Sequence, residues 1–135
     1  MHASAFQDAI SAIVHRDSRF DPDAYFFLKE ALDFTVKRIK EENEGESRHV
    51  SGPELLNGFR DHAVQEFGPM AVTLLREWGV HQCQHIGEMV FALIGEQVFG
   101  KQDSDTLDDF CDIYQFEEAF VAPFLPSNNP QIPNC

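Results

Sequence analysis

QCQHIGEMVFALIGEQV, residues 82–98, contains the longest uninterrupted apolar run of the chain, Met89–Ile94. Apolar residues recur here with the spacing of a helix, and Phe91 and Ala92 fill the other side. A helix that is apolar nearly all round is typical of the buried centre of a protein. The sequence therefore predicts a mainly α protein, with four or five helices around a buried helix at 82–98.

The other helices are expected on the N-terminal side of this stretch. The best-marked start is Ser51, because Glu54 follows three residues later and completes a capping box. Asp21 followed by Pro22 is a second helix-start signal, with a cap residue before a proline at the first helical position. Together with the apolar spacing, these signals predict helices at 4–15, 22–40, 52–67 and 71–78.

The C-terminal third is harder to assign from its pattern. Residues 97–99 and 110–116 mix aromatic, β-branched and polar residues, so they could pair as a short β-hairpin. With that hairpin the order of elements would be similar to a winged helix, which is the alternative architecture. We expect one globular domain over 1–126 and an extended or disordered tail over 127–135, which is rich in proline and asparagine.

The charge of the chain is strongly negative, because 23 acidic residues face 10 basic ones and give a net charge of −13. Nucleic acid and anionic membranes are disfavoured partners, since both attract Lys and Arg. A basic protein partner is electrostatically compatible with such a surface. Hydrophobic residues make up 43% of the chain, which is ordinary for a folded domain.

The cysteines of the chain and the length of its apolar stretches indicate the cellular location. Cys83, Cys111 and Cys135 are odd in number and widely spaced, so they predict reduced thiols rather than a disulfide framework. No apolar run approaches the roughly 20 residues that span a bilayer. The N-terminus lacks the basic and apolar regions of a secretory signal. We therefore expect a cytoplasmic protein.

The strongest chemical motif lies at the start of the 82–98 segment. His81, His85 and Glu88 would share one face of a helix, and imidazole with carboxylate suits a divalent metal such as Zn²⁺. Cys83 lies beside both histidines and could instead act as a thiolate nucleophile. The motif lacks HExxH spacing and a fourth ligand, so solvated histidines at a helix end are the simpler interpretation.

Aromatic residues are dense near the C-terminus. Most should belong to the core, but any exposed ones would form an apolar docking patch rimmed by acids. The candidate partner-binding residues are Phe110, Tyr114, Phe116 and Phe120.

Two charged clusters are weaker candidates for binding sites. Acidic residues at 103–112 are interpreted as a surface loop, since their spacing does not fit an EF-hand; they are Asp103, Asp105, Asp108, Asp109 and Asp112. A basic patch would be needed for a DNA-binding regulator, and its only candidates are Arg16, Arg19, Lys37, Arg38, Lys40 and Arg48.

Three stretches carry a resemblance to a known group of proteins. HVSGPELLNGFRDHAVQEFGPMA (49–71), IGEMVFALI (86–94) and DDFCDIYQFEEAF (108–120) resemble conserved hypothetical proteins of about this length from planctomycete and verrucomicrobial bacteria. The resemblance covers the chain from Phe6 to Phe120. It implies a bacterial origin and no assigned activity, and it supplies no site residues.

The sequence favours a non-enzymatic interaction or adaptor protein with an acidic surface, an aromatic docking patch and no cofactor. Two alternatives stay open. One is a small metal- or thiol-dependent enzyme built on His81, Cys83, His85 and Glu88. The other is a winged-helix-like regulator.

Overall fold

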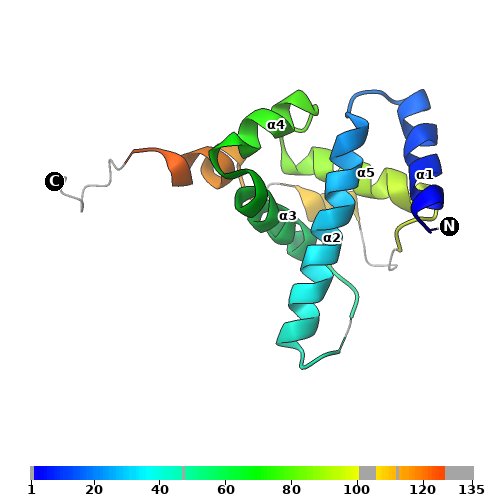
Figure 1. Cartoon of the computed structure of the whole chain (residues 1–135), viewed down its shortest axis with the longest axis horizontal. Coiled ribbons are helices and arrows are strands. Elements are labelled where there is room, and N and C mark those ends of the chain that lie inside the picture. The colour runs from blue at the N-terminus through cyan, green and yellow to red at the C-terminus, as the bar shows by residue number, and fades with distance from the viewer. Residues whose placement is uncertain (1, 47, 101–105, 112, 127–135) are drawn as a thin grey trace.

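A computed structural model of the chain describes residues 2–46, 48–100, 106–111 and 113–126 (Figure 1). The expected tail at 127–135 and Asp103, Asp105 and Asp112 therefore lie outside the described residues. Within these residues the structure has five α-helices and no strand, which confirms the mainly α prediction. None of these helices has the length and the apolar character needed to cross a membrane. The α-helices are α1 (His2–Arg16), α2 (Pro22–Glu42), α3 (Gly52–Phe67), α4 (Ala71–Glu77) and α5 (Cys83–Gly95).

Shorter helical turns connect and follow the α-helices. A 3-10 turn, η1 (Gly68–Met70), separates α3 from α4. After α5 come the 3-10 turn η2 (Leu107–Phe110), the π-helical turn η3 (Glu117–Val121) and the 3-10 turn η4 (Ala122–Phe124). Figure 1 shows the last two turns leading away from the helical body toward the C-terminus.

Two helix starts follow the predicted caps. The Ser51 side chain accepts from the Glu54 N–H, and the Glu54 carboxylate accepts from the Ser51 N–H at 3.0 Å, so the capping box is confirmed. Asp21 caps α2 by accepting from the Asp23 N–H at 2.8 Å. These local bonds satisfy amide groups that the first turn of a helix leaves without partners.

The hairpin considered for 97–99 and 110–116 is not formed by the described residues. Gln97 has a positive φ of 66°, and the Val98 N–H bonds back to the Leu93 carbonyl at 3.1 Å. This is a Schellman turn, which ends α5 at Gly95 and uses the amide that a strand would need. Phe110 belongs to η2, so the described part of this region does not form the wing of a winged helix either.

The closest helix contact joins α2 to α3 at Thr35 and Gly58. A Cβ added at Gly58 would lie 1.8 Å from the Thr35 Oγ1, so only glycine allows this approach. Thr35 is 1% exposed, and its hydroxyl donates to the Ala31 carbonyl at 2.7 Å. The polar atom is therefore satisfied inside its own helix, and the two backbones can pack closely.

A second close contact attaches the C-terminal third to α5. The Cβ that Gly87 lacks would lie 2.5 Å from the Cβ of Phe110, whose ring is buried. The Tyr114 hydroxyl donates to the Leu56 carbonyl of α3 at 2.9 Å. The segment after α5 therefore completes the hydrophobic core, to which Phe110, Phe116 and Phe120 belong.

We expect Gly58→Ala to lower the free energy of unfolding by about 2 kcal/mol or more, because the new methyl group overlaps Thr35. Urea unfolding followed by circular dichroism measures the change. Gly95→Ala is the matched control. Its Cβ would meet nothing within 4 Å, so this change should raise stability by up to about 1 kcal/mol. Thr35→Ala in the Gly58→Ala background should recover part of the loss, and equal losses at both glycines would contradict the contact.

Alkaline titration tests the burial of the two tyrosines of the chain. Burial raises the pKa of Tyr25 to about 12 and that of Tyr114 well above its usual value. Above pH ~10 a tyrosine of the unfolded chain loses its proton, while the buried tyrosine of the folded protein keeps it. The free energy of unfolding therefore falls as pH rises above the unfolded pKa of about 10. We expect phenolate absorbance to appear only together with unfolding. Reversible ionisation near pH ~10 in the folded protein would contradict this placement.

Candidate functional site

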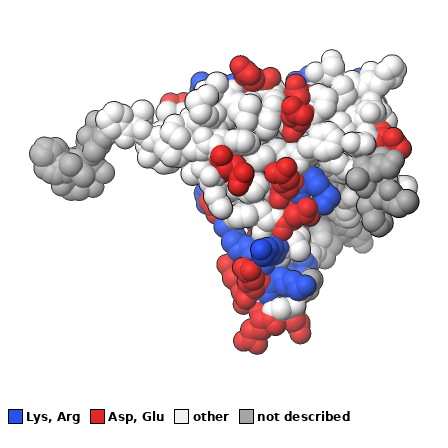
Figure 2. Space-filling model, in the orientation of Figure 1, with Lys and Arg blue, Asp and Glu red and all other residues white. Residues whose placement is uncertain are grey.

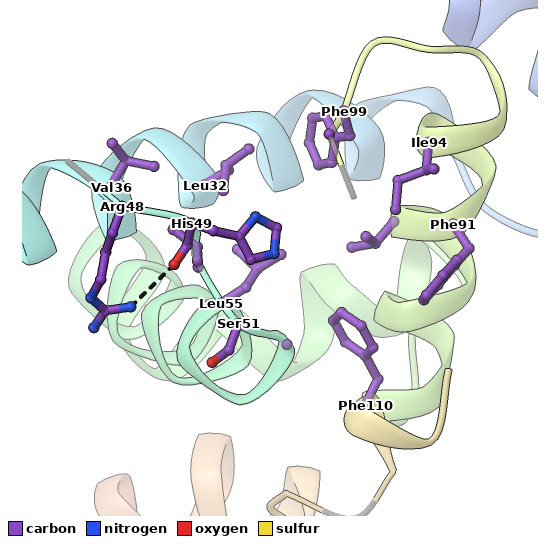
Figure 3. A pocket seen from close by; sticks show the side chains of 14 residues that line it. Leu32, Val36, Arg48, His49, Ser51, Leu55, Phe91, Ile94, Phe99 and Phe110 are labelled. Carbon is purple, nitrogen blue, oxygen red and sulfur yellow. Dashed lines mark hydrogen bonds between the residues drawn. The ribbon is translucent and has the colours of Figure 1, made fainter. Parts of the chain in front are cut away.

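The main candidate site is an apolar cavity of about 230 Å³ between α2, the start of α3 and α5 (Figure 3). Leu32 and Val36 lie one turn apart on α2 and face it. Val90 and Ile94 have the same spacing on α5. The rest of the lining is Arg48, His49, Val50, Ser51, Gly52, Leu55, Phe91, Phe99, Gly100 and Phe110.

The walls of this cavity are held by contacts already described. Phe110 is fixed against α5 by its approach to Gly87. The capping box holds the 48–52 segment at the start of α3, next to Leu55. The cavity therefore lies between elements that are separately anchored, and Leu32, Val36, Phe91 and Ile94 remain only half-buried around it.

One end of the cavity carries paired charges. Arg48 donates to both carboxylate oxygens of Glu54, at 2.9 Å to Oε1, and also to the His49 carbonyl at 3.1 Å. The Arg48 guanidinium is the main reason why the pKa of Glu54 is lowered to about 2. Burial opposes this shift, and the Ser51 N–H adds to it. Figure 3 shows the His49 ring facing the space between α2 and α5. The polar groups at this end thus orient one another.

The size and lining of the cavity fit a small apolar group. An apolar cavity of about 150 Å³ is enough to bind benzene, while pockets for drug-sized ligands are about 300–1,000 Å³. The observed volume therefore matches one aromatic ring or one branched aliphatic side chain. Apolar atoms line most of it, and among the described residues no carboxylate lines it.

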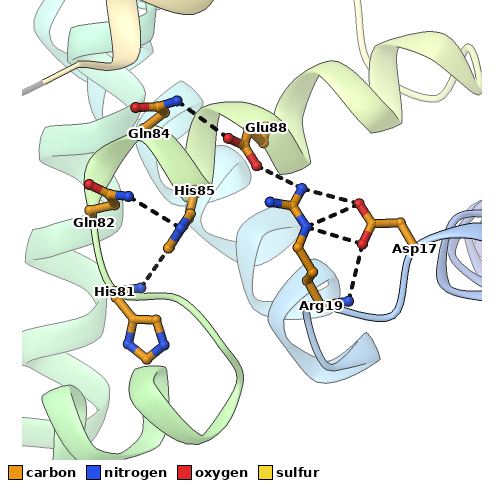
Figure 4. Close-up of polar contacts among 7 residues, drawn as sticks. All are labelled: Asp17, Arg19, His81, Gln82, Gln84, His85 and Glu88. Atoms are coloured by element: carbon orange, nitrogen blue, oxygen red, sulfur yellow. Dashed lines mark hydrogen bonds and ion pairs between the residues drawn. The ribbon is translucent and has the colours of Figure 1, made fainter.

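The predicted metal residues lie at the start of α5, where His85 and Glu88 bond to other partners (Figure 4). The His81 ring lies edge-on to the His85 ring, with 5.7 Å between their centroids. The His85 Nδ1 accepts from the backbone N–H of His81 at 3.0 Å, and its Nε2 lies 3.3 Å from the Gln82 amide nitrogen. Glu88 forms an ion pair with Arg19 at 2.7 Å. Over the part of the chain that the structure describes, no three His, Cys, Asp or Glu side chains are grouped to hold a metal ion.

Arg19 is the residue that sequence reasoning missed in this cluster. It lies in the loop between α1 and α2, where it also donates to Asp17 at 3.1 Å. That hydrogen bond is the main reason why the pKa of Asp17 is lowered. Burial is the main reason why the pKa of His85 is lowered, against the opposing charge of Glu88. No sequence spacing links position 19 to position 88.

The proposed aromatic docking patch is corrected by burial. Phe110, Phe116 and Phe120 are 3%, 8% and 0% exposed. Tyr114 is half-buried, and its ring lies 5.9 Å from that of Phe120. Tyr114, Phe116 and Phe120 pack against one another, and Phe110 packs against Phe91 of α5, so these residues do not form an exposed surface.

The basic patch needed for DNA binding is dispersed among ion pairs. Arg16 pairs with Glu96 at 2.8 Å and Arg38 with Asp61 at 2.7 Å, while Arg19 and Arg48 pair as described above. Their positive charges are therefore largely compensated on the surface.

No family model, no curated protein and no solved structure matches this chain. The resemblance to planctomycete and verrucomicrobial proteins stays an expectation. We therefore base the functional proposal on the geometry of the cavity.

Because the cavity is apolar, we expect a small apolar molecule to bind in it. We expect indole to shift the methyl resonances of Val36, Val90 and Ile94 in isotope-edited NMR spectra, because all three line the space. Val36→Trp should fill the cavity and abolish the shifts. Met70→Trp, which adds the same ring at a residue 60% exposed, should leave them unchanged. Shifts that are absent, or equal in both variants, would contradict an accessible cavity.

Proposed function

We propose that the protein is a non-enzymatic interaction protein whose cavity between α2 and α5 receives one apolar side chain of a protein partner. The observation that carries this proposal is the cavity itself, which is apolar, sized for a single side chain and walled by three anchored elements. Interfaces draw most of their affinity from a few side chains that fill such pockets.

Half-buried residues around the cavity support the same role. Val36, Phe91 and Ile94 each keep apolar surface that an inserted side chain would remove from water. Removal of apolar surface contributes roughly 25 cal/mol per Å² before the costs of association. An anchor in the cavity would therefore gain free energy from both α2 and α5.

Charge favours a basic partner. The net charge is −13, and the exposed end of α2 and the following loop carry Glu41, Glu42, Glu44 and Glu46. Figure 2 shows acidic side chains over the visible face and at this end of the molecule, where Lys and Arg lie beside them. Arg48 links the end of this loop to the cavity. We therefore expect Lys or Arg next to the apolar anchor of the partner.

The two alternative functions have less support from the geometry. A metal-dependent enzyme would need Glu88 to leave Arg19. A thiol-dependent enzyme would need access to Cys83, which is 3% exposed. A winged-helix regulator would need the β-hairpin that is not formed by the described residues.

Affinity capture from cells of the source organism tests the proposal. The wild-type chain and Met70→Trp should retain one stoichiometric partner, and Val36→Trp should lose it because the cavity is filled. Capture should weaken as salt screens the attraction between the acidic surface and a basic partner.

Circular dichroism must first show that both tryptophan variants are folded. A partner that Val36→Trp retains at wild-type level would contradict docking at the cavity. Recovery of the bare chain from every sample would contradict the interaction role.

A further inference from the structure

We propose that Cys83 and Cys111 form a reversible disulfide when the folded protein meets a peroxide, which makes them a redox modification site. This proposal does not depend on the docking function. It rests on a small cavity of about 70 Å³, separate from the apolar one, which both cysteines line together with Gln82 and Tyr114.

Residues close to Cys111 in the sequence, Phe110 and Tyr114, contact the first turn of α5. Cys83 is the first residue of α5, and its Sγ donates to the Tyr114 carbonyl at 3.2 Å. Gly87, one turn further along the same face, meets the Cβ of Phe110. Cys111 directly follows Phe110, so it lies between these two contact points.

A disulfide sets a strict limit on the separation of the two residues that it joins. A disulfide needs a Cα separation of about 4.4–6.8 Å. The Cys111 Sγ lies 4.0 Å from the Leu107 carbonyl, and the Cys83 Sγ bonds to the Tyr114 carbonyl. Both side chains must therefore turn into the cavity that they share before the bond can form.

The two thiols differ in access, which sets the order of the reaction. Cys111 is half-exposed and Cys83 is buried, so peroxide reaches Cys111 first. The Cys111 thiolate attacks one peroxide oxygen, breaks the O–O bond and becomes a sulfenic acid, while hydroxide leaves and takes up a proton to form water. The Cys83 thiolate then attacks the sulfenic sulfur and displaces a second hydroxide, which also becomes water. The two thiols lose two electrons, and hydrogen peroxide is reduced to two waters.

The bond would fasten the segment after η2 to α5. Phe110, which lines the apolar cavity, would then be fixed from both sides, by Gly87 and by the cross-link at its neighbour. Oxidation should therefore stiffen that wall of the cavity without unfolding α5.

The test uses the full chain with Cys135→Ser, so that only the two cysteines of interest remain. The folded protein is treated with hydrogen peroxide, quenched with acid, blocked with an alkylating agent and mapped by mass spectrometry. We expect a monomer lighter by two hydrogens, with the Cys83 and Cys111 peptides joined, and full reversal by dithiothreitol.

Equilibration in glutathione buffers shows whether the folded structure favours the disulfide over its formation in the unfolded chain. The equilibrium constant for disulfide formation against glutathione should be at least about tenfold greater in native buffer than in concentrated urea. In urea the unfolded chain must bring Cys83 and Cys111 together from a disordered loop. Cys111→Ser in the same background is the control and should leave Cys83 reduced under peroxide.

Three results would overturn the proposal. The first is Cys111 held as sulfenic or sulfinic acid beside a reduced Cys83. The second is a dimer linked through Cys111. The third is a native tendency to form the bond that is no greater than that of the unfolded chain.

Discussion

The close approach of α2 and α3 at Thr35 and Gly58 is the constraint on which the rest of the structure depends. Helices cross this closely only where one of them lacks a side chain, and Gly58 supplies that gap. Thr35 fills it without leaving a buried polar group unsatisfied, because its hydroxyl bonds to the Ala31 carbonyl. Leu32 and Val36, on either side of Thr35, are thereby held beside α5 to form one wall of the apolar cavity.

The sequence was a good guide wherever structure is set by neighbours along the chain. Ser51 and Glu54 predicted the start of α3 because a capping box needs only four consecutive residues. The helix expected at 82–98 is shorter, since the left-handed turn at Gln97 ends it. Gln is not a typical residue for that conformation, so the sequence held no signal for the turn.

The site was less predictable because it depends on contacts between distant residues. Phe110 lies against Gly87, so a segment that suggested an exposed aromatic patch belongs to the core. The apolar stripes containing Val36 and Ile94 were visible in the sequence. A stripe does not reveal whether neighbouring helices fill the space between its side chains or leave a cavity. Arg19 likewise reaches Glu88 only through the fold.

The two proposals assign partner recognition to the apolar cavity between α2 and α5, and a response to oxidation to the cysteines of a second, smaller cavity. The cavity is the central element of this account. The most direct measurement is the electron density of crystals equilibrated under xenon, which enters dry apolar cavities. We expect a xenon atom among Val36, Phe91 and Ile94. Side chains closing that space, with no xenon bound between α2 and α5, would contradict the account.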